Sequence, residues 1–233
     1  MKKNRVLIAI LVTILIIIII PIIYVSNYYK AQKIENYLKS NNQVKVIKKD
    51  NYYYFDGKGQ ETAFIFYPGG KVESTSYAPL LNKLASSGID CFLVNMPFNL
   101  PILNKDAAEK IIENNNYNNW YIGGHSLGGV TSSLYKNKLI DGYIFLASYP
   151  TTNMNKRVLL IRGDQDGVLK LKGYNESKDN WGKDYKEVII KGGNHSNFGN
   201  YGLQKKDNKS TISREKQQEQ TNNEIINYIN MIK

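Results

Sequence analysis

The run Gly124-His125-Ser126-Leu127-Gly128 follows the strand-like residues Trp120-Tyr121-Ile122 and precedes a helical stretch that begins near Gly129. A serine between a strand and a helix lies on a tight turn that pushes its hydroxyl out of the sheet. Glycines two residues before and after the serine avoid clashes across that turn. The N-terminus of the following helix points toward developing negative charge. The pattern therefore predicts that Ser126 is a nucleophile.

A carboxylate and a histidine follow this serine in chain order, each at the end of a strand-like run. Asp164 and Asp166 come after one such run, and His195 comes after a later one. An imidazole removes the serine proton and returns it to the leaving group, while a buried carboxylate fixes the imidazole tautomer. The other histidine, His125, is the immediate neighbour of Ser126, so its side chain leaves the turn in a different direction. We therefore expect His195 to be the general base.

Such a reaction also needs N–H groups that stabilise a negatively charged oxygen. One is the N–H of the residue after the nucleophile, which is Leu127. The other comes from the loop after an early strand, and here Ala63–Tyr67 is followed by Pro68-Gly69-Gly70-Lys71. We expect Gly70 to be the second donor, with Lys71 as the alternative.

These motifs resemble the compact, lidless α/β-hydrolases related to dienelactone hydrolase, in the subgroup with a proline-glycine-glycine loop. The resemblance covers residues 62–232, and the further segments that carry it are Asn95-Met96-Pro97, Gly163–Gly167, Gly192–Gly202 and Thr211–Arg214. It implies an α/β-hydrolase fold and ester hydrolysis. It also implies Asp166 as the acid, because the family usually has glycine, two spacer residues, aspartate and glycine. Dienelactone hydrolase itself uses a cysteine nucleophile, so the serine here does not imply dienelactone chemistry.

The alternation of strand-like and helical runs predicts a doubly wound, mainly parallel sheet, whose sites lie at the carboxyl ends of the strands. The strand-like runs fall near 44–48, 52–55, 62–67, 90–95, 118–123, 141–147, 156–162 and 185–191. Only about 40 residues separate Ser126 from Asp166, which is enough for a helix and two strands but not for a cap domain. The polar segment 204–211 is predicted to be a flexible surface loop.

The N-terminus differs from the rest of the chain. After Met1–Arg5, residues 6–25 contain only two residues that are not apolar. At about 1.5 Å per residue this stretch matches the roughly 30 Å thickness of a bilayer core. Basic residues ahead of it favour a cytoplasmic N-terminus. We predict a cytoplasmic tip and transmembrane signal anchor over 1–27, a juxtamembrane linker over 28–43, and a hydrolase domain over 44–233. This single-pass protein would belong to the cell membrane, with its domain outside the cytoplasm.

The formal net charge is +11. Residues 1–50 contain nine basic and two acidic residues, a balance of +7. This excess suits contact with anionic lipid headgroups, although a composition rich in lysine, asparagine and isoleucine explains it equally well. No basic helix or aromatic-lined groove indicates nucleic acid. Two histidines and the single cysteine, Cys91, lie far apart in the sequence, which argues against a metal site. No feature indicates a cofactor or an obligate protein partner.

The predicted activity is hydrolysis of a small-molecule ester through an acyl-enzyme, with Ser126, His195 and Asp166 as the triad. An acyltransferase or a thioesterase on the same fold would use the same residues and differ in the group that resolves the acyl-enzyme. A catalytically silent binding module would keep only the fold. The module is disfavoured because every triad position is filled.

Overall fold

The computed structural model describes residues 2–231 of the 233-residue chain. Within this range, one eight-stranded sheet has the strand order β1-β2-β4-β3-β5-β6-β7-β8. The pairs β1–β2 and β2–β4 are antiparallel, and all the other pairs are parallel. The strands are β1 (Lys45–Lys48), β2 (Tyr52–Asp56), β3 (Thr62–Tyr67), β4 (Asp90–Val94), β5 (Asn119–His125), β6 (Ile140–Leu146), β7 (Arg157–Gly163) and β8 (Tyr185–Ile190).

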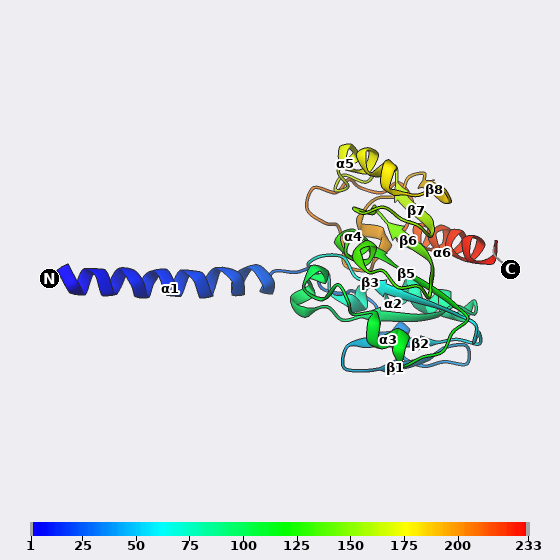
Figure 1. Ribbon diagram of the computed structural model, residues 1–233, viewed down its shortest axis with the longest axis horizontal. Coiled ribbons are helices and arrows are strands. Elements are labelled where there is room, and N and C mark those ends of the chain that lie inside the picture. Colours follow the sequence, from blue (N-terminus) through cyan, green and yellow to red (C-terminus); the bar gives the residue numbers. More distant parts are fainter. Residues whose placement is uncertain (1, 232–233) are drawn as a thin grey trace.

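The helices of the described chain lie on both faces of the sheet, apart from the first, which extends away from it (Figure 1). The α-helices are α1 (Lys2–Ser26), α2 (Ala78–Ser86), α3 (Glu109–Glu113), α4 (Leu127–Leu134), α5 (Leu171–Glu176) and α6 (Arg214–Asn230). The 3₁₀ helices are η1 (Glu35–Leu38), η2 (Ser74–Tyr77), η3 (Pro97–Asn99), η4 (Pro101–Asn104), η5 (Ser177–Asn180) and η6 (Ser196–Phe198).

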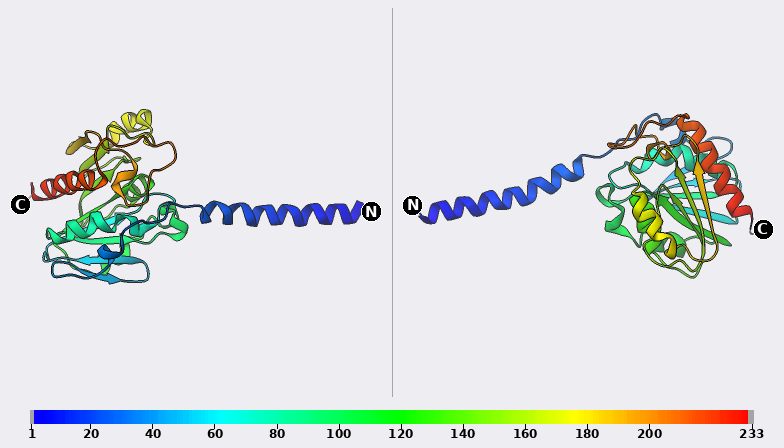
Figure 2. Two further views of the ribbon diagram at one scale, coloured as in Figure 1. Left: turned by 180° about the vertical axis from the view of Figure 1, so that it is seen from behind. Right: turned by 90° about the horizontal axis from the view of Figure 1, so that it is seen from above.

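The central strands are apolar on both sides because helices cover both faces of the sheet (Figure 2). In β3, Phe64 and Phe66 join the core beneath α2 and α6. Ala63 and Ile65 join the core beneath α3 and α5. A strand that is buried on both faces reads as a continuous apolar run instead of an alternating one. The two cores therefore explain the uninterrupted apolar sequence of β3.

The predicted doubly wound, mainly parallel sheet is present, and strands occur at all eight predicted positions. Between Ser126 and Asp166 the chain forms α4, β6 and β7 without an inserted domain. The carboxyl ends of the parallel strands therefore lie at one edge of the sheet with no cap over them. We call this the carboxyl edge, and the opposite one the amino edge.

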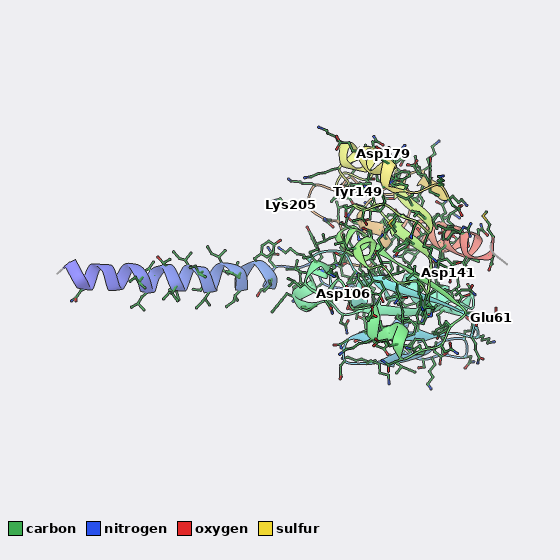
Figure 3. All side chains as sticks on the ribbon, viewed as in Figure 1. Glu61, Asp106, Asp141, Tyr149, Asp179 and Lys205 are labelled. Atoms are coloured by element: carbon green, nitrogen blue, oxygen red, sulfur yellow. The ribbon has the colours of Figure 1, made fainter. Side chains whose placement is uncertain are left out.

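Helix α1 leaves the domain on the side of the carboxyl edge. Lys205, from the loop after the histidine segment, is on this side, whereas Asp141 and Glu61, near the starts of β6 and β3, are on the opposite side (Figure 3). No helix in the described range 2–231 has both the length and the hydropathy of a membrane span. The transmembrane helix predicted over 6–25 is therefore not confirmed. The segment is helical, but helical structure alone does not make a span.

Candidate active site

Ser126 lies on the turn between β5 and α4, with φ 52° and ψ −124°. Residues that carry a side chain rarely adopt a positive φ, and such strain is found mostly at functional sites. The end of β3 packs directly against this turn. A methyl group on Gly124 or Gly128 would overlap the carbonyl oxygen of Tyr67. Both glycines of the motif are therefore required by the close approach of β3.

The structure brings Asp166 and His195 together. Asp166 Oδ2 lies 2.8 Å from His195 Nδ1, and the two side chains are 2% and 1% exposed. The other carboxylate oxygen, Oδ1, accepts hydrogen bonds from the N–H groups of Val168 (2.9 Å) and Leu169 (2.8 Å). These backbone bonds hold the carboxylate in one orientation. Because Nδ1 must carry the proton that Asp166 accepts, neutral His195 has a free lone pair on Nε2.

His195 Nε2 is the ring atom left for chemistry. It is buried and has no hydrogen-bond partner among the described residues. His195 and Ser126 line the same pocket, without a hydrogen bond between them. Catalytic hydrogen bonds are often long before substrate binds. The arrangement therefore has an oriented imidazole beside a strained serine.

The alternative carboxylate, Asp164, points elsewhere. Its Oδ1 accepts hydrogen bonds from the Gly192 N–H at 2.7 Å and from the Gln165 side chain at 3.2 Å. Its carboxylate is exposed to solvent, and the carboxylate that bonds to the His195 ring is that of Asp166. Asp164 therefore joins two loops, while Asp166 is the residue that reaches the imidazole.

The loop after β3 leaves one N–H group available. The Gly69 N–H donates to the Tyr77 hydroxyl at 3.1 Å, and the Lys71 N–H donates to the Asn99 carbonyl at 2.7 Å. The Gly70 N–H has no partner among the described residues. A methyl group on Gly70 would lie 2.8 Å from the Leu127 side chain, so the two loops are in contact there. Since Leu127 begins α4, its N–H lacks an intrahelical acceptor. This geometry favours Gly70 over Lys71 as the second donor.

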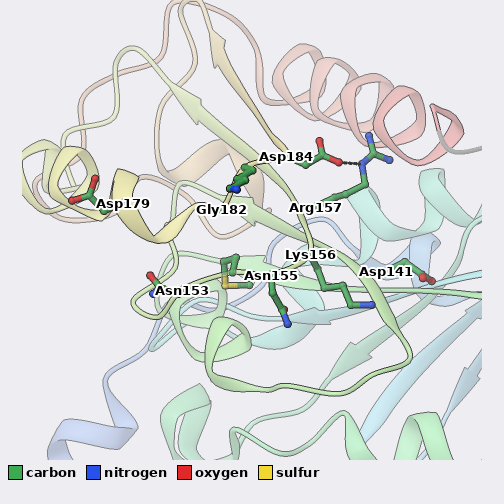
Figure 4. Close-up of a pocket in the computed structure, with 10 residues that line it drawn as sticks. Asp141, Asn153, Asn155, Lys156, Arg157, Asp179, Gly182 and Asp184 are labelled. Atoms are coloured by element: carbon green, nitrogen blue, oxygen red, sulfur yellow. Dashed lines mark hydrogen bonds and ion pairs between the residues drawn. The ribbon is translucent and has the colours of Figure 1, made fainter.

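The pocket beside Ser126 has a volume of about 230 Å³. Its walls are mainly apolar, and the residues that line it are Ser126, Leu127, Val130, Ala147, Ser148, Tyr149, Val168, Leu169, Lys170 and His195. A larger hollow of about 590 Å³ lies at the amino edge, where Arg157 and Asp184 form an ion pair of 2.8 Å (Figure 4). Ligands of such sheets bind at the carboxyl edge. The smaller pocket is therefore the candidate site.

His125 is buried next to the site, and both of its ring nitrogens have hydrogen-bond partners. Tyr77 Oη lies 2.8 Å from Nδ1, and Nε2 lies 3.1 Å from the carbonyl oxygen of His195. Because that carbonyl can only accept, Nε2 carries the proton, and the Tyr77 hydroxyl donates to Nδ1. Burial raises the pKa of Tyr77. Burial and the nearby His195 lower the pKa of His125 well below its usual value. His125 is therefore neutral and cannot also serve as the base.

The His125 ring and the Tyr77 hydroxyl together connect three loops. The Tyr77 hydroxyl that donates to His125 also accepts from the Gly69 N–H, and the far side of the ring holds the His195 carbonyl. The loop after β3, the serine turn and the histidine loop are thus joined by one buried chain of hydrogen bonds. The sequence indicated only that the His125 side chain leaves the turn in a different direction from Ser126, and no pattern in it indicated this contact.

Asp207 is the residue that the sequence argument missed. Its Oδ1 accepts from the N–H groups of Gly167 (3.0 Å) and His195 (3.3 Å). Its Oδ2 accepts from the N–H (2.8 Å) and the hydroxyl (2.6 Å) of Ser196. The segment 204–211, expected to be a flexible surface loop, therefore supplies a carboxylate that joins the acid loop to the histidine loop. A single aspartate in a polar stretch carries no sequence pattern that would reveal such a contact.

Other reactive side chains lie outside the site. Cys91 is buried in β4, and burial raises the pKa of its thiol well above the usual value. It belongs to the core. Within the described range, no group of three or more His, Cys, Asp or Glu side chains is placed to hold a metal ion.

Comparisons with solved structures find the same fold in known proteins. Est1E from Butyrivibrio proteoclasticus is similar in structure, with 15% identity, a TM-score of 0.55, and coverage of 81% of this chain and 99% of that one. An esterase from Thermogutta terrifontis has 12% identity, a TM-score of 0.52, and coverage of 80% and 94%. The mouse alpha/beta hydrolase domain-containing protein 10 has 12% identity, a TM-score of 0.57, and coverage of 82% and 100%.

At these identities the structural likeness shows the fold alone. No curated protein sequence matches the chain. A sequence model described as the alpha/beta hydrolase family matches residues 63–219, which include Ser126, Asp166 and His195. This match covers more than half of the chain, and we conclude that the protein belongs to the alpha/beta hydrolase family.

Proposed function

We propose that this protein is a serine hydrolase that cleaves carboxylic esters through an acyl-enzyme. The observation that carries the proposal is the His195–Asp166 pair, whose free Nε2 shares one pocket with Ser126. Membership of the alpha/beta hydrolase family and the esterases among its structural neighbours support ester hydrolysis in general. The assignment of the three residues to a triad is our own.

The proposed reaction has two halves. In the first, His195 Nε2 takes the proton of Ser126 as the serine oxygen attacks the ester carbonyl, and Asp166 stabilises the imidazolium that forms. The N–H groups of Gly70 and Leu127 donate to the oxyanion. Protonated His195 then gives its proton to the departing alcohol. In the second half, His195 activates a water that hydrolyses the acyl-enzyme and releases the acid.

The pocket favours a short acyl group. Its volume is about 230 Å³, and Val130, Val168 and Leu169 contribute apolar surface to it. No cap domain between Ser126 and Asp166 encloses a longer chain. We therefore propose esters of short acyl groups as the substrate class. Relationship to the dienelactone hydrolase subgroup remains a proposal that rests on the sequence motifs.

A fluorophosphonate probe tests the proposal, because it reacts readily with an activated serine. We expect the probe to label the wild-type protein at Ser126, as mapped by peptide mass spectrometry, and purified protein to hydrolyse short aryl esters. Ser126→Ala should not be labelled, whereas Ser87→Ala is the matched control and should be labelled like the wild type, because Ser87 is an exposed serine at the end of α2 and does not line the pocket. Absence of labelling in the folded wild-type protein would favour the silent binding module instead.

We also propose that the N-terminal helix attaches the protein to the cell membrane, with the catalytic domain outside the cytoplasm. The apolar composition of 6–25 supports this, together with apolar side chains from Ile10 to Tyr24 that are 41–65% exposed. Basic residues at the start of the chain favour a cytoplasmic N-terminus. We expect the protein to stay in the membrane fraction after a high-salt wash and to be digested by protease added to intact cells. A shorter soluble form beginning near residue 27 would contradict attachment.

A further inference from the structure

The segment just after α1 is bound to the carboxyl edge by backbone hydrogen bonds. Tyr29 forms a parallel bridge with Val72, in which its N–H donates to the Lys71 carbonyl (2.8 Å) and its carbonyl accepts from the Glu73 N–H (2.9 Å). The Tyr29 hydroxyl accepts from the Lys205 N–H at 2.9 Å. The segment predicted as a linker is therefore fastened between the loop after β3 and the loop after the histidine.

This attachment decides where α1 leaves the domain. The helix ends at Ser26, three residues before Tyr29. Near its end, the Lys71 ammonium lies 4.2 Å from the centre of the Tyr24 ring. The apolar helix thus departs beside the loop that carries the proposed oxyanion donor, on the side of the site and away from the amino edge (Figures 1 and 2).

Large apolar side chains are exposed on the domain around this exit. We call them the edge patch, and they are Phe98 (65% exposed), Ile102 (49%), Leu103 (56%) and Leu203 (50%). Two observations place the patch next to the linker. Helix α1 contacts η3, which contains Phe98, and η3 contacts η4, which contains Ile102 and Leu103. Leu203 lies two residues before Lys205, whose N–H donates to the Tyr29 hydroxyl.

The backbone holds part of the edge patch in an unfavourable conformation. Phe98 and Asn99 have φ values of 53° and 56°, in the left-handed region. Asparagine enters this region more readily than most residues, but for a bulky residue such as phenylalanine it costs free energy. The Phe98 ring nevertheless lies in solvent. Backbone strain at an exposed apolar residue is typical of a surface that binds a ligand, another protein or a membrane.

Positive charge accompanies the edge patch. Lys30 and Lys33 of the linker and Lys205 and Lys206 of the loop after the histidine are exposed to solvent. Apolar side chains next to exposed lysines match the chemistry of a lipid surface, because the apolar groups enter the acyl boundary while the ammonium groups meet anionic headgroups.

We propose that the carboxyl edge of the catalytic domain touches an anionic lipid surface, so that the active site receives esters presented at that surface. The inference rests on the proposed function and on attachment through α1, and it goes beyond both. An anchor alone would leave the orientation of the domain free. Here the bridge between Tyr29 and Val72 holds the end of α1 at the carboxyl edge, and the edge patch contacts the lipid. The pocket of Ser126 then faces the lipid surface.

Site-specific fluorescence on the full-length protein tests this orientation. The only native cysteine, Cys91, is buried, so single cysteines at Leu203→Cys, Leu103→Cys or Gln60→Cys accept a dye that reports on polarity. Leu203 and Leu103 belong to the edge patch, whereas Gln60 is exposed just before β3 at the amino edge and serves as the matched control. Vesicles of phosphatidylglycerol and phosphatidylcholine in equal parts are added, and vesicles of phosphatidylcholine alone serve for comparison.

We expect a blue shift of the dye at Leu203→Cys and Leu103→Cys with the mixed vesicles, a smaller shift with phosphatidylcholine alone, and none at Gln60→Cys. Protein that sediments with vesicles without any shift at the edge patch would overturn the proposal, because α1 would then bind lipid while the domain stands away. Equal shifts at all three positions would overturn it too. Hydrolysis of a soluble aryl ester in the same samples tests the proposed function separately, since its loss leaves the fluorescence result unchanged.

Discussion

The serine turn and the histidine loop each carry one histidine, and the two imidazole rings lie 4.5 Å apart. In the histidine loop, His195 has Nδ1 bonded to Asp166 and Nε2 without a partner. In the serine turn, His125 has Nδ1 bonded to Tyr77 and Nε2 bonded to the His195 carbonyl. Both rings are buried, so burial does not distinguish them. The difference is in their partners. The Nε2 lone pair of His195 receives no hydrogen bond from residues 2–231, whereas both nitrogens of His125 bond to other loops.

The proposed base is therefore the histidine with one ring nitrogen left without a partner in the described chain. A carboxylate on Nδ1 orients an imidazole and stabilises its charged form, whereas a hydroxyl donor on Nδ1 and a carbonyl on Nε2 keep it neutral. The chemistry of each histidine therefore follows from partners contributed by other loops. Asp166 comes from the end of β7, and Tyr77 comes from the end of η2.

Removing the proposed base or nucleophile should cause the greatest loss of activity. His195→Ala and Ser126→Ala should each lower ester turnover by about 10⁴–10⁶-fold, because base and nucleophile act as a unit. The double variant should be scarcely worse than either single one. Steady-state hydrolysis of a short aryl ester measures this, with circular dichroism to establish folding. Near-wild-type turnover in purified, folded Ser126→Ala would remove the serine from the mechanism.

The second prediction compares the effects on kcat of replacing Asp166 and Asp164, the two carboxylates that follow β7. Asp166→Asn keeps the shape of the side chain but removes the charge that stabilises the imidazolium, so kcat should fall by roughly 10³–10⁴-fold. Asp164→Asn is the matched control, because Asp164 accepts from the Gly192 N–H, whereas the imidazole bonds to Asp166. It should change kcat little. A larger loss from Asp164→Asn, with both variants folded, would reverse the assignment of the acid.

A smaller effect tests the role of His125 in joining loops. His125→Gln removes the ring that links Tyr77 to the His195 carbonyl, so the loop after β3 and the histidine loop should shift relative to Ser126. Because small misplacements of catalytic groups cost up to about 10²-fold, kcat should fall by roughly 10–100-fold. Tyr77→Phe should act in the same direction, since it leaves the Gly69 N–H and His125 Nδ1 without their shared partner.

The distinguishing measurement for His125→Gln is the reaction with fluorophosphonate. Slower but complete labelling at Ser126 is expected, because the base remains present and only its position changes. Complete loss of labelling, equal to that of His195→Ala, would mean that His125 takes part in the chemistry and that the comparison of the two rings is wrong.

The smallest effect is on the pH dependence of stability. Burial lowers the pKa of His125, so the unfolded chain binds a proton near pH 6.5 that the folded chain does not. The free energy of unfolding should therefore fall as the pH drops below about 6.5, by at most roughly 1.4 kcal/mol per pH unit for this group. Denaturant unfolding of wild type and His125→Gln between neutral pH and pH 5 measures the difference. Identical slopes would show that His125 titrates normally in the fold.

Short-range patterns predicted the doubly wound sheet that the structure contains, and they supplied the candidate site residues. The apolar run of β3 and the glycines around Ser126 produce local structure that does not depend on distant partners. The preference for Asp166 over Asp164 followed from the resemblance to a family, and the contact with His195 agrees with it. The transmembrane helix over 6–25 was inferred from the same kind of local pattern, and the described structure contains no helix that qualifies as a span.

Local sequence patterns predicted the strands and helices, the serine turn, and the candidates for nucleophile, acid and base. Those properties depend on neighbours within a few positions, where apolar periodicity and glycine placement act directly. Only the tertiary structure decided that Asp207 joins the acid loop to the histidine loop, that His125 has both nitrogens occupied, and that Tyr29 pairs with Val72. These contacts join residues far apart in the chain. A hydrogen bond between such residues depends on where the whole fold places its loops, and no spacing in the sequence encodes that.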